Sequence, residues 1–593
     1  MNRYSLLENI KYILKVVKEK DRILLAEMVG MGLISAFLPY IVPYLSKAAV
    51  SCIVNGTGFE RFAIVVVLFT VIFIVLKTMY NAINLSLWWR FFALKNDFVI
   101  SRLDKAMEMS FENLEKKDIL DRMKKAENAT QGNSGVEGML YSIKDLGIYI
   151  VRILFSVTLI TFLSPVAVIV VISLSAINYK IGQKTKQRDV KLLMDKKAPV
   201  DRQINYWSRV TSNFAYAKEI RLFRLKEWIF KEIRNNNQAA LALERESKRN
   251  WLITNSISYV LGFFQQLLIY GFLIYRVYSG TIAIDDFVFY SGCIMVLFDT
   301  VGKILDTGST LSKQSIEINC YREVIELDDP EQSKNDTKLD LPEENSFMLE
   351  VKNVSFRYDG QRDYALRDVN MQIDSKSKVA IVGKNGSGKS TLIKLLCRLY
   401  KPTDGEILLN GINIWEYELS TYLSVIGPVF QDINIFALSL KQNIDFGAGD
   451  DEERVNNAIA QAGLADKVRT LEQGIHSELL TIMSDQGVVL SGGEKQKLAI
   501  ARSLYKKSRM VIMDEPTAAL DPLAEQRLYQ SLNEMIEDKT GVYISHRLSS
   551  TRFCDYIYLF DTGKIIEEGT HDELMICKGD YYDMFQLQAQ YYV

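Results

Sequence analysis

The chain has 593 residues, enough for several domains, and its 71 Lys and Arg residues balance 72 Asp and Glu residues to a formal net charge of −1. This balance argues against nucleic-acid binding through bulk positive charge, and a hydrophobic content of 48% excludes an intrinsically disordered chain. The six cysteines are scattered without a CxxC pair and only three histidines occur, which argues against a disulfide scaffold, a structural zinc site or a histidine metal cluster.

Residues 5–20 have the pattern of an amphipathic helix. Leucine, isoleucine and valine residues fall on one face, and lysine and glutamate residues fall on the other. We expect this helix to lie on a membrane surface. The alternative is a helix that packs against the protein core.

Six apolar stretches follow, and each is long enough to approach or cross the roughly 30 Å hydrocarbon layer of a membrane. They lie near residues 23–45, 62–84, 139–162, 165–182, 252–275 and 287–309. The prediction is an α-helical membrane domain over residues 1–327 with six transmembrane helices. Charged residues within these stretches, such as Lys77, Lys144 and Arg152, are expected to face the protein interior or a watery cavity.

Two of the connections, residues 85–138 and 183–250, are long, charged and helical in pattern. We expect them to be extensions of the membrane helices into the cytosol; a separate soluble helical insert is the alternative. Basic residues crowd the N-terminus and these connections, so the positive-inside tendency places the connections and both termini in the cytoplasm.

Residues 328–346 are polar, charged and contain two prolines, which predicts a linker. Residues 347–593 have the pattern of an α/β domain of the P-loop NTPase type. Short β-branched runs, such as Lys378–Val382 and Met510–Met513, alternate there with helical segments and glycine turns.

A phosphate-binding loop is the most specific motif in the sequence. The run KVAIVGKNGSGKST at 378–391 places GxxxxGK[ST] between a predicted strand and a helix that is predicted from Thr391 to Leu396. Glycines let backbone N–H groups surround a phosphate, Lys389 supplies positive charge to the β and γ phosphates, and the Ser390 hydroxyl is placed for Mg²⁺. The candidate nucleotide-binding residues of this loop are Gly383, Asn385, Gly386, Ser387, Gly388, Lys389, Ser390 and Thr391.

A second predicted strand, in the run MVIMDEP at 510–516, ends in two carboxylates. Asp514 is the candidate ligand of Mg²⁺. Glu515 is the candidate catalytic carboxylate that polarises the attacking water.

These motifs carry a family resemblance. The run Leu490-Ser491-Gly492-Gly493-Glu494 resembles the signature sequence of ATP-binding-cassette (ABC) ATPases, and it precedes the Asp514 strand as that family requires. With six apolar spans ahead of the cassette, the whole chain resembles an ABC exporter half-transporter. The resemblance implies an ATPase with ATP and Mg²⁺, coupled to movement of a substrate across the membrane.

The resemblance also implies roles for individual residues. Tyr358 matches the aromatic residue that stacks on adenine, Gln431 matches the glutamine that contacts Mg²⁺, and His546 matches the switch histidine at the γ-phosphate. The run 519–521 matches the loop that crosses the dimer interface. The signature residues Ser491, Gly492, Gly493 and Glu494 are expected to contact the ATP that a second cassette holds.

Two departures from the family pattern stand out. The signature ends in Glu494 where glutamine is usual, and residues 481–487 only loosely resemble the family's T-E-V-G-E-R-G. The expected partner is a second half-transporter, either identical or homologous, and the expected surroundings are the lipid bilayer, without nucleic acid.

Segments 110–122 and 217–229 resemble the regions that couple the cassettes to the membrane helices, with Phe111, Leu114, Phe223 and Trp228 as candidate contacts. The cargo is predicted only as a small amphipathic molecule, a lipid or a peptide. No peptidase segment precedes the first span, so we expect that this chain does not trim the leader of a peptide cargo. Candidate residues for a cargo cavity are aromatic, polar or basic: Tyr40, Tyr44, Lys77, Tyr80, Asn81, Lys144, Tyr149, Arg152, Gln265, Gln266 and Tyr270.

The leading hypothesis is ATP-driven export by alternating access in a homodimer or heterodimer of the cell membrane, with the cassette in the cytoplasm. The C-terminal run YYDMFQLQAQYYV faintly resembles Gram-positive peptide exporters, which favours a bacterial source. The alternatives are an importer built on the exporter fold, with a siderophore-like cargo, and a nucleotide-gated membrane sensor without net transport.

Overall fold

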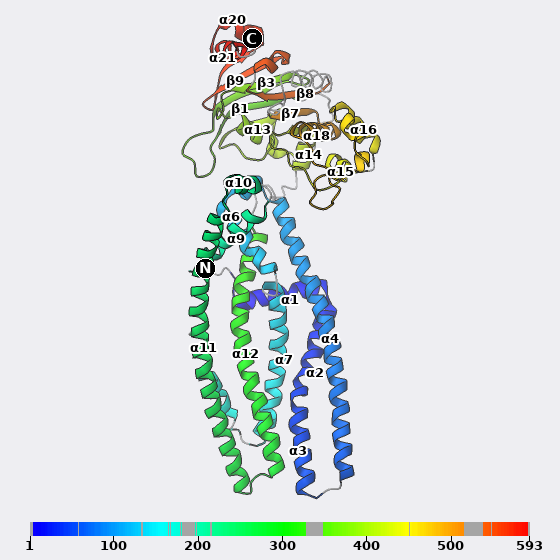
Figure 1. Ribbon diagram of the computed structural model, residues 1–593, viewed down its shortest axis with the longest axis vertical. Coiled ribbons are helices and arrows are strands. Elements are labelled where there is room, and N and C mark those ends of the chain that lie inside the picture. Colours follow the sequence, from blue (N-terminus) through cyan, green and yellow to red (C-terminus); the bar gives the residue numbers. More distant parts are fainter. Residues whose placement is uncertain are drawn as a thin grey trace. The chain divides into compact units, whose positions relative to one another are not determined.

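The computed structural model describes residues 4–56, 59–131, 135–163, 165, 168–177, 180, 196, 198–213, 216–327, 348–449, 451–514, 538–546 and 548–590. The chain divides into two units. Met1–Met109 and Lys116–Asp328 form the first unit, and Ser110–Glu115 and Asp329–Val593 form the second. The predicted fold class is confirmed, since the first unit is helical and the second is an α/β unit with a phosphate-binding loop (Figure 1). The predicted linker lies outside the described residues.

The helical unit consists of a short N-terminal helix and several much longer ones. Its described helices are α1 (Leu6–Lys20), α2 (Arg22–Phe37), η1 (Leu38–Tyr40), α3 (Ile41–Val54), α4 (Phe59–Glu108), α6 (Lys117–Thr130), α7 (Gly135–Thr161), α9 (Ala198–Ser212), α10 (Ala217–Leu222), α11 (Lys226–Tyr278) and α12 (Ile284–Ile325).

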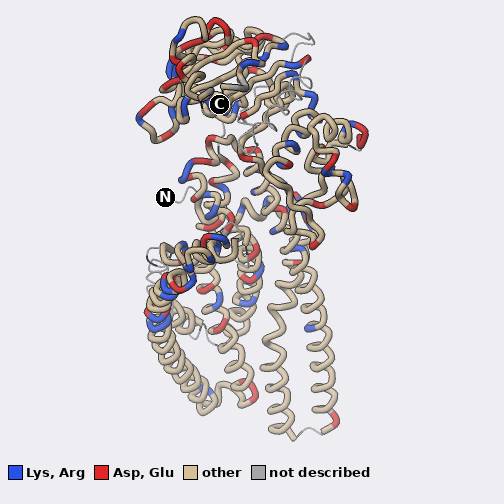
Figure 2. The backbone as a smooth tube through the Cα atoms, turned by 45° about the horizontal axis from the view of Figure 1, so that its top comes forward, with Lys and Arg blue, Asp and Glu red and all other residues tan. Residues whose placement is uncertain are grey.

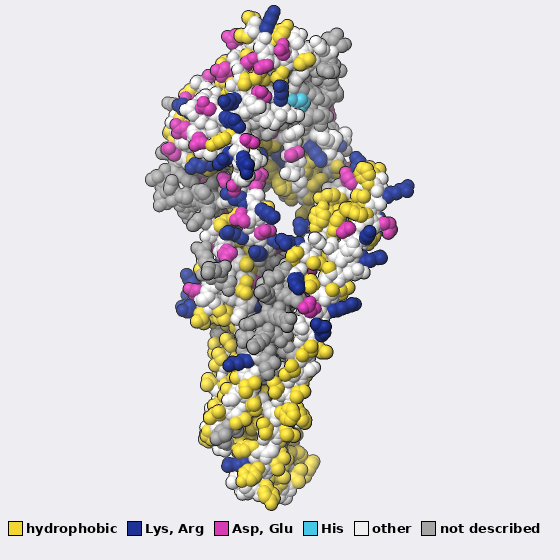
Figure 3. Space-filling view, turned by 90° about the vertical axis from the view of Figure 1, so that its left-hand side faces the viewer, with side chains coloured by type: hydrophobic (Ala, Val, Ile, Leu, Met, Phe, Trp, Pro, Cys, Tyr) yellow, Lys and Arg dark blue, Asp and Glu magenta, His cyan; other side chains and the backbone are white. Residues whose placement is uncertain are grey.

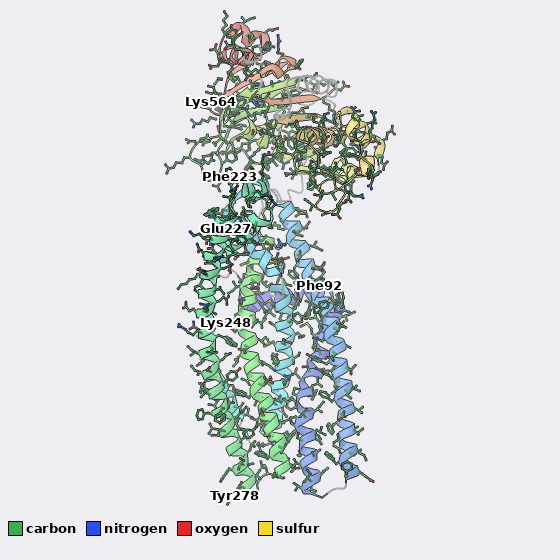
Figure 4. The ribbon with its side chains drawn as sticks, in the orientation of Figure 1. Phe92, Phe223, Glu227, Lys248, Tyr278 and Lys564 are labelled. Atoms are coloured by element: carbon green, nitrogen blue, oxygen red, sulfur yellow. The ribbon has the colours of Figure 1, made fainter. Side chains whose placement is uncertain are left out.

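The long helices exceed what a bilayer requires. At 1.5 Å per residue, the 53 residues of α11 extend for about 80 Å, well over twice the roughly 30 Å of hydrocarbon. Figure 4 shows the helix running from Glu227 past Lys248 to Tyr278. Charged residues gather toward the Glu227 end of the unit (Figure 2), whereas apolar side chains cover the surface toward the Tyr278 end (Figure 3). Helices α4 and α11 continue well beyond the predicted apolar spans 62–84 and 252–275.

Among the described residues, four helical segments are long and apolar enough to cross a membrane: Arg22–Val54, Phe62–Glu108, Lys226–Tyr278 and Ile284–Ile325. They contain the first, second, fifth and sixth predicted spans. The third predicted span coincides with α7, which carries Lys144 and Arg152 and is not one of these four segments. Part of the fourth appears as a shorter apolar helix, Val168–Ile177.

Helix α1 packs across the other helices of its unit (Figure 1) rather than presenting its whole apolar face outward. Ile13 and Val17 are fully buried in a core that α2, α4, α7 and α12 also build. Asn9 is fully buried as well, and its amide nitrogen donates to Ser315 Oγ at 2.8 Å and to Asn319 Oδ1 at 2.9 Å, both on α12. The packing alternative therefore describes α1 better than the membrane surface does.

We expect Asn9→Ala to lower the free energy of unfolding by about 2 kcal/mol, because it leaves buried polar groups of α12 without their partner. Chemical unfolding of the purified protein in detergent measures this change. Lys18→Ala, at an exposed position of the same helix, is the control. Equal stability of the two variants would contradict the assigned role of Asn9.

The α/β unit is built on two sheets. A six-stranded sheet has the order β10-β9-β3-β8-β7-β6, in which β9, β3, β8, β7 and β6 are mutually parallel and β10 is antiparallel to β9. An antiparallel sheet has the order β2-β1-β4-β5. The strands are β1 (Leu349–Phe356), β2 (Leu366–Ile373), β3 (Lys378–Gly383), β4 (Asp404–Leu409), β5 (Ile412–Asn413), β6 (Ile426–Val429), β7 (Met510–Asp514), β8 (Thr540–Ser545), β9 (Tyr556–Asp561) and β10 (Lys564–Gly569).

The parallel strands are buried on both faces, so successive residues enter two different cores. In β3, Val379 and Ile381 join the core shared with the antiparallel sheet, whereas Ala380 and Val382 join the core formed with α15, α16 and α18. This explains why the predicted strands are continuous apolar runs without alternation. The longer helices of the unit are α13 (Lys389–Leu396), α14 (Leu419–Val425), α15 (Leu440–Asp445), α16 (Glu452–Gln461), α17 (Ala465–Arg469), α18 (Gly492–Tyr505), α20 (His571–Cys577) and α21 (Asp580–Gln590).

Candidate functional site: a nucleotide-binding edge

The phosphate-binding loop joins β3 to α13, as its sequence predicts. Helix α13 begins at Lys389, two residues earlier than predicted, so Lys389 and Ser390 form its first turn. Lys389 is buried, and its ammonium donates to the carbonyl oxygens of Gly383 at 2.8 Å and Lys384 at 2.9 Å. The positive charge is thereby held within the curve of the loop.

Two positions of the loop require glycine, because the backbone has a positive φ there and because a Cβ atom would clash with a neighbouring carbonyl oxygen. Gly388 has a φ of +105°, and a Cβ there would lie 2.7 Å from the carbonyl oxygen of Ala365. Gly383 has a φ of +145°, and a Cβ would lie 2.1 Å from the carbonyl oxygen of Phe560. Gly386, by contrast, has open space around it. The loop is pressed against its neighbours at both ends and open in the middle.

The loop also fits a phosphate group in its polar chemistry. The hydroxyl of Ser387 is buried and has no hydrogen-bond partner among the residues that the structure describes. Asn385 and Ser390 are exposed beside it, and the first N–H groups of α13 lack intrahelical acceptors. An anion bound at this helix N-terminus would meet these donors and the positive end of the helix dipole.

The other candidate residues collect at the same edge because the strands are parallel. Asp514 is the last residue of β7 and is mostly buried, His546 follows β8, and Gln431 lies two residues beyond β6. The strand order β3-β8-β7-β6 places the loop, His546, Asp514 and Gln431 in sequence along that edge. At about 4.8 Å between neighbouring strands, the row extends for about 14 Å. Glu515 and the run 519–521 lie outside the described residues.

Tyr358 joins this edge from the antiparallel sheet. Its hydroxyl lies 3.1 Å from Thr391 Oγ1, in the first turn of α13. Its ring packs edge-on against Phe356, with centroids 4.9 Å apart, and against Tyr400 at 5.4 Å. An aromatic ring is therefore held beside the phosphate-binding helix.

The segment that follows Gln431 is held by two residues that the sequence interpretation did not include. Asn443 accepts from the Phe436 N–H at 3.0 Å and from Arg502 Nη2 at 2.8 Å. Arg502 also donates to the carbonyl oxygens of Asn434 and Asn443, at 2.8 and 2.7 Å. Burial lowers the pKa of Arg502. No local motif marks these two residues, because their roles depend on α15 and α18 packing together.

The signature motif forms the beginning of α18. Ser491 is the N-cap residue, and Glu494 completes a capping box: Glu494 Oε2 accepts from the Ser491 N–H at 2.7 Å, and Ser491 Oγ accepts from the Glu494 N–H at 3.4 Å. Gly492 is exposed. The departure from glutamine at position 494 thus preserves the helix cap.

The signature is displaced from the phosphate-binding loop of its own chain. Ser503, near the end of α18, donates to the carbonyl oxygen of Gly427 in β6 at 3.0 Å, and β6 is three strands away from β3. Gly492 begins the helix about 16 Å from Ser503 along its axis. The motif therefore presents an exposed helix N-terminus of its own, separate from the edge that holds Lys389.

The candidate cargo residues have mixed surroundings. Arg152 donates to the Ser35 carbonyl oxygen at 2.9 Å, Lys144 lies 3.2 Å from Asp145, and Tyr40 bonds with Ser156, so these three are structural links between or within helices. Gln265, Gln266 and Tyr270 instead line a small pocket between α11 and α12. The amide nitrogen of Gln265 is buried there, and no described residue forms a hydrogen bond with it.

The two segments predicted to couple the units have different packing partners. Ser110–Glu115, which contains α5 (Phe111–Glu115), belongs to the second unit, where the Phe111 ring packs edge-on against Tyr400 with centroids 5.7 Å apart. In the other segment Phe223 is exposed after α10 (Figure 4), and Trp228 packs against Trp207.

Comparison with known proteins agrees with this architecture. The ABC transporter family model matches residues 366–518, from β2 past the signature and β7. The subtilin transport ATP-binding protein of Bacillus subtilis is 26% identical over 571 residues, 95% of this chain and 91% of that protein. The ATP-dependent lipid A-core flippase of Methylococcus capsulatus is 38% identical over 265 residues, 43% of each chain.

The fold is also shared with a solved structure. A bacterial Atm1-family ABC exporter with ATP bound superposes with a TM-score of 0.80 at 22% identity, covering 96% of this chain and 98% of that one. The nucleotide-binding edge and these matches define an ABC-type ATPase that couples ATP hydrolysis to transport. The chain therefore carries an ABC transporter domain in its second unit, and over most of its length it resembles ABC transport proteins.

We expect Gly388→Ala to weaken ATP binding by about tenfold or more, because both the positive φ and the Ala365 carbonyl oppose a Cβ. Binding of a fluorescent ATP analogue to the purified full-length protein measures this. Gly411→Ala is the matched control, since Gly411 also has a positive φ, +77°, but open space around it. Equal ATP affinity in the two variants would show that the close contact is unimportant.

Proposed function

We propose that this half-transporter exports a peptide cargo as one of a pair of chains, using ATP and Mg²⁺ at a site completed by its partner. The observation that carries the proposal is the separation of the signature helix from the phosphate-binding edge within one chain. Lys389 lies at one of these places and the exposed Gly492 at the other, and we propose that a second chain brings the two kinds of surface together.

At the phosphate-binding edge, Lys389 and the N–H groups of Gly386, Ser387 and Gly388 hold the β and γ phosphates. Tyr358 stacks on the adenine base. Ser390, Gln431 and Asp514 would hold Mg²⁺, which would neutralise phosphate charge when bound. Gln431 and Asp514 enter from neighbouring strands, as the sheet order requires.

We assign hydrolysis to one carboxylate, Glu515, and one histidine, His546. Glu515 follows Asp514 in the sequence and orients the attacking water, and His546 contacts the γ-phosphate from the end of β8. The Ser491 hydroxyl and the Gly492 and Gly493 N–H groups of the second chain's cassette contact the same phosphate from the opposite side.

This arrangement converts ATP binding into movement. The signature contacts exist only when two cassettes meet, so ATP favours the closed pair over the open one. Turning a 1:99 equilibrium into 99:1 takes about 5.5 kcal/mol of preference for the closed state. Loss of the γ-phosphate removes these contacts and reverses the bias. Segments 110–122 and 217–229 pass the movement to the membrane helices.

A peptide is the cargo best supported among those the sequence allows. The match to the subtilin transport protein extends over 95% of this chain and includes the membrane helices, where cargo is recognised. The flippase match covers 43% of the chain, and the match to the mitochondrial iron–sulfur clusters transporter of Candida glabrata covers 50%. Cassette similarity alone carries no information on cargo.

Reconstitution into proteoliposomes with outward-facing cassettes tests the direction and the cargo. We expect ATP to drive a labelled hydrophobic peptide into the lumen, the side away from the cassettes, and Lys389→Met to abolish this flux. Accumulation in the opposite direction would indicate an importer. ATPase activity that changes with the cargo but moves none would indicate a sensor, and preferential movement of a labelled lipid would replace the peptide.

We expect Glu515→Gln to retain ATP binding and to lower the ATPase turnover by about 10²-fold or more, because the amide cannot orient and polarise water as a carboxylate does. Steady-state phosphate release measures the turnover. Glu472→Gln, an exposed position of the same unit, is the control. Unchanged turnover in Glu515→Gln would remove this residue from the catalytic set.

A further inference from the structure

The carboxylate of Glu494 is shared between its own helix and a lysine from another helix. One oxygen, Oε2, accepts from the Ser491 N–H at 2.7 Å, and the other, Oε1, lies 3.3 Å from Lys467 Nζ. Both side chains are partly buried, with 25% and 29% of their surfaces exposed. Sequence interpretation singled out Glu494 as a departure but did not identify its counterion, which is 27 residues away in the chain.

Lys467 is held in place by the packing of α17. Ala465 and Val468 of this helix pack against the core that contains α16 and α18. Lys497 of α18 donates to the carbonyl oxygen of Gly463 at 2.9 Å, just before α17 begins. Two lysines therefore join α17 and its preceding turn to α18, one through the Glu494 carboxylate and one through a backbone carbonyl.

Glu494 stays ionised in this setting. Burial raises the pKa of Glu494, but the hydrogen bonds from Ser491 and the Lys467 ammonium outweigh it, so the pKa lies below its ordinary value. The beginning of α18 carries a permanent negative charge. A helix N-terminus presents roughly half a positive elementary charge, which one uncompensated carboxylate would reverse. The Lys467 charge restores a net positive sign.

The capping box also fixes how the Ser491 hydroxyl is used. Ser491 Oγ accepts from the Glu494 N–H at 3.4 Å, so its own proton remains available to an acceptor outside the helix. Glu494 thus stabilises the geometry of the helix cap, but its negative charge repels an approaching phosphate. Lys467 neutralises that charge and leaves the cap intact.

We propose that Lys467 is a positioning residue of the signature, which neutralises Glu494 so that α18 can receive the phosphates of ATP held by the second cassette. This inference rests on the proposed function, and it assigns a role to a residue on α17 that touches neither nucleotide nor reacting atoms. A glutamine at position 494 would need no such counterion.

The test is a double-mutant cycle in the full-length protein in lipid nanodiscs. We expect Lys467→Met to raise the KM for ATP hydrolysis by about tenfold with little change in kcat, because an uncompensated charge opposes phosphate. Lys467→Arg should retain the KM of the unmodified chain. In a Glu494→Gln background, Lys467→Met should have no further effect, since the charge that it balanced is gone.

Two further measurements distinguish charge compensation by Lys467 from a simple packing role. They are the dependence of the effect on ionic strength and the effect of a matched lysine variant. The KM increase caused by Lys467→Met should shrink between about 0.1 and 1 M salt, as the screening length falls from about 10 to about 3 Å. Lys497→Met removes the same charge from the same helix pair, but its partner is the Gly463 carbonyl. Glu494→Gln should therefore not rescue it.

An equal effect of Lys467→Met in both backgrounds, or an effect independent of salt, would overturn the inference. Binding of a fluorescent ATP analogue to the same variants carrying Glu515→Gln measures the change in nucleotide affinity without hydrolysis. If the cycle behaves as expected but no cargo moves, only the proposed export is wrong. If cargo moves and the cycle is additive, only the role of Lys467 is wrong.

Discussion

The parallel pairing of β6, β7, β8, β3 and β9 is the constraint on which the candidate nucleotide site depends. Strands buried on both faces must be apolar throughout, so polar side chains can enter only where the strands end. Parallel strands end at the same edge. Residues as distant in the chain as Lys389, Gln431, Asp514 and His546 therefore meet there, and the helix that follows β3 brings its positive end to the same place.

A different constraint acts on the helical unit, because the surroundings of its long helices change from lipid to water along their length. Helices α4, α11 and α12 are far longer than a bilayer is thick, and most of their charged residues lie toward one end (Figure 2). A single helix can be apolar within lipid and charged beyond it, because its backbone hydrogen bonds are satisfied internally along its whole length.

The signature helix shows how a change of residue type can preserve function in one respect and disturb it in another. Glutamate in place of glutamine keeps the capping box, since either side chain can accept from the Ser491 N–H. It also introduces a charge at a helix end that is proposed to meet phosphate. Lys467 lies where the tertiary structure can balance that charge, from a helix whose local sequence gives no indication of the pairing.

The sequence by itself determined the local chemistry: the loop between β3 and α13, the strand ending in Asp514, the signature cap and the apolar spans all depend on residues close together in the chain. These features follow from spacing, since backbone conformation and helix capping act over a few residues. The tertiary structure decided which distant groups meet. Three contacts illustrate this: the packing of α1 onto α12 through Asn9, the Asn443–Arg502 link and the Lys467–Glu494 pair. Each joins segments that lie too far apart in the chain for a sequence pattern to indicate the contact. Such contacts arise only when helices and sheets are packed, because burial then forces each polar group to find a partner wherever the fold provides one.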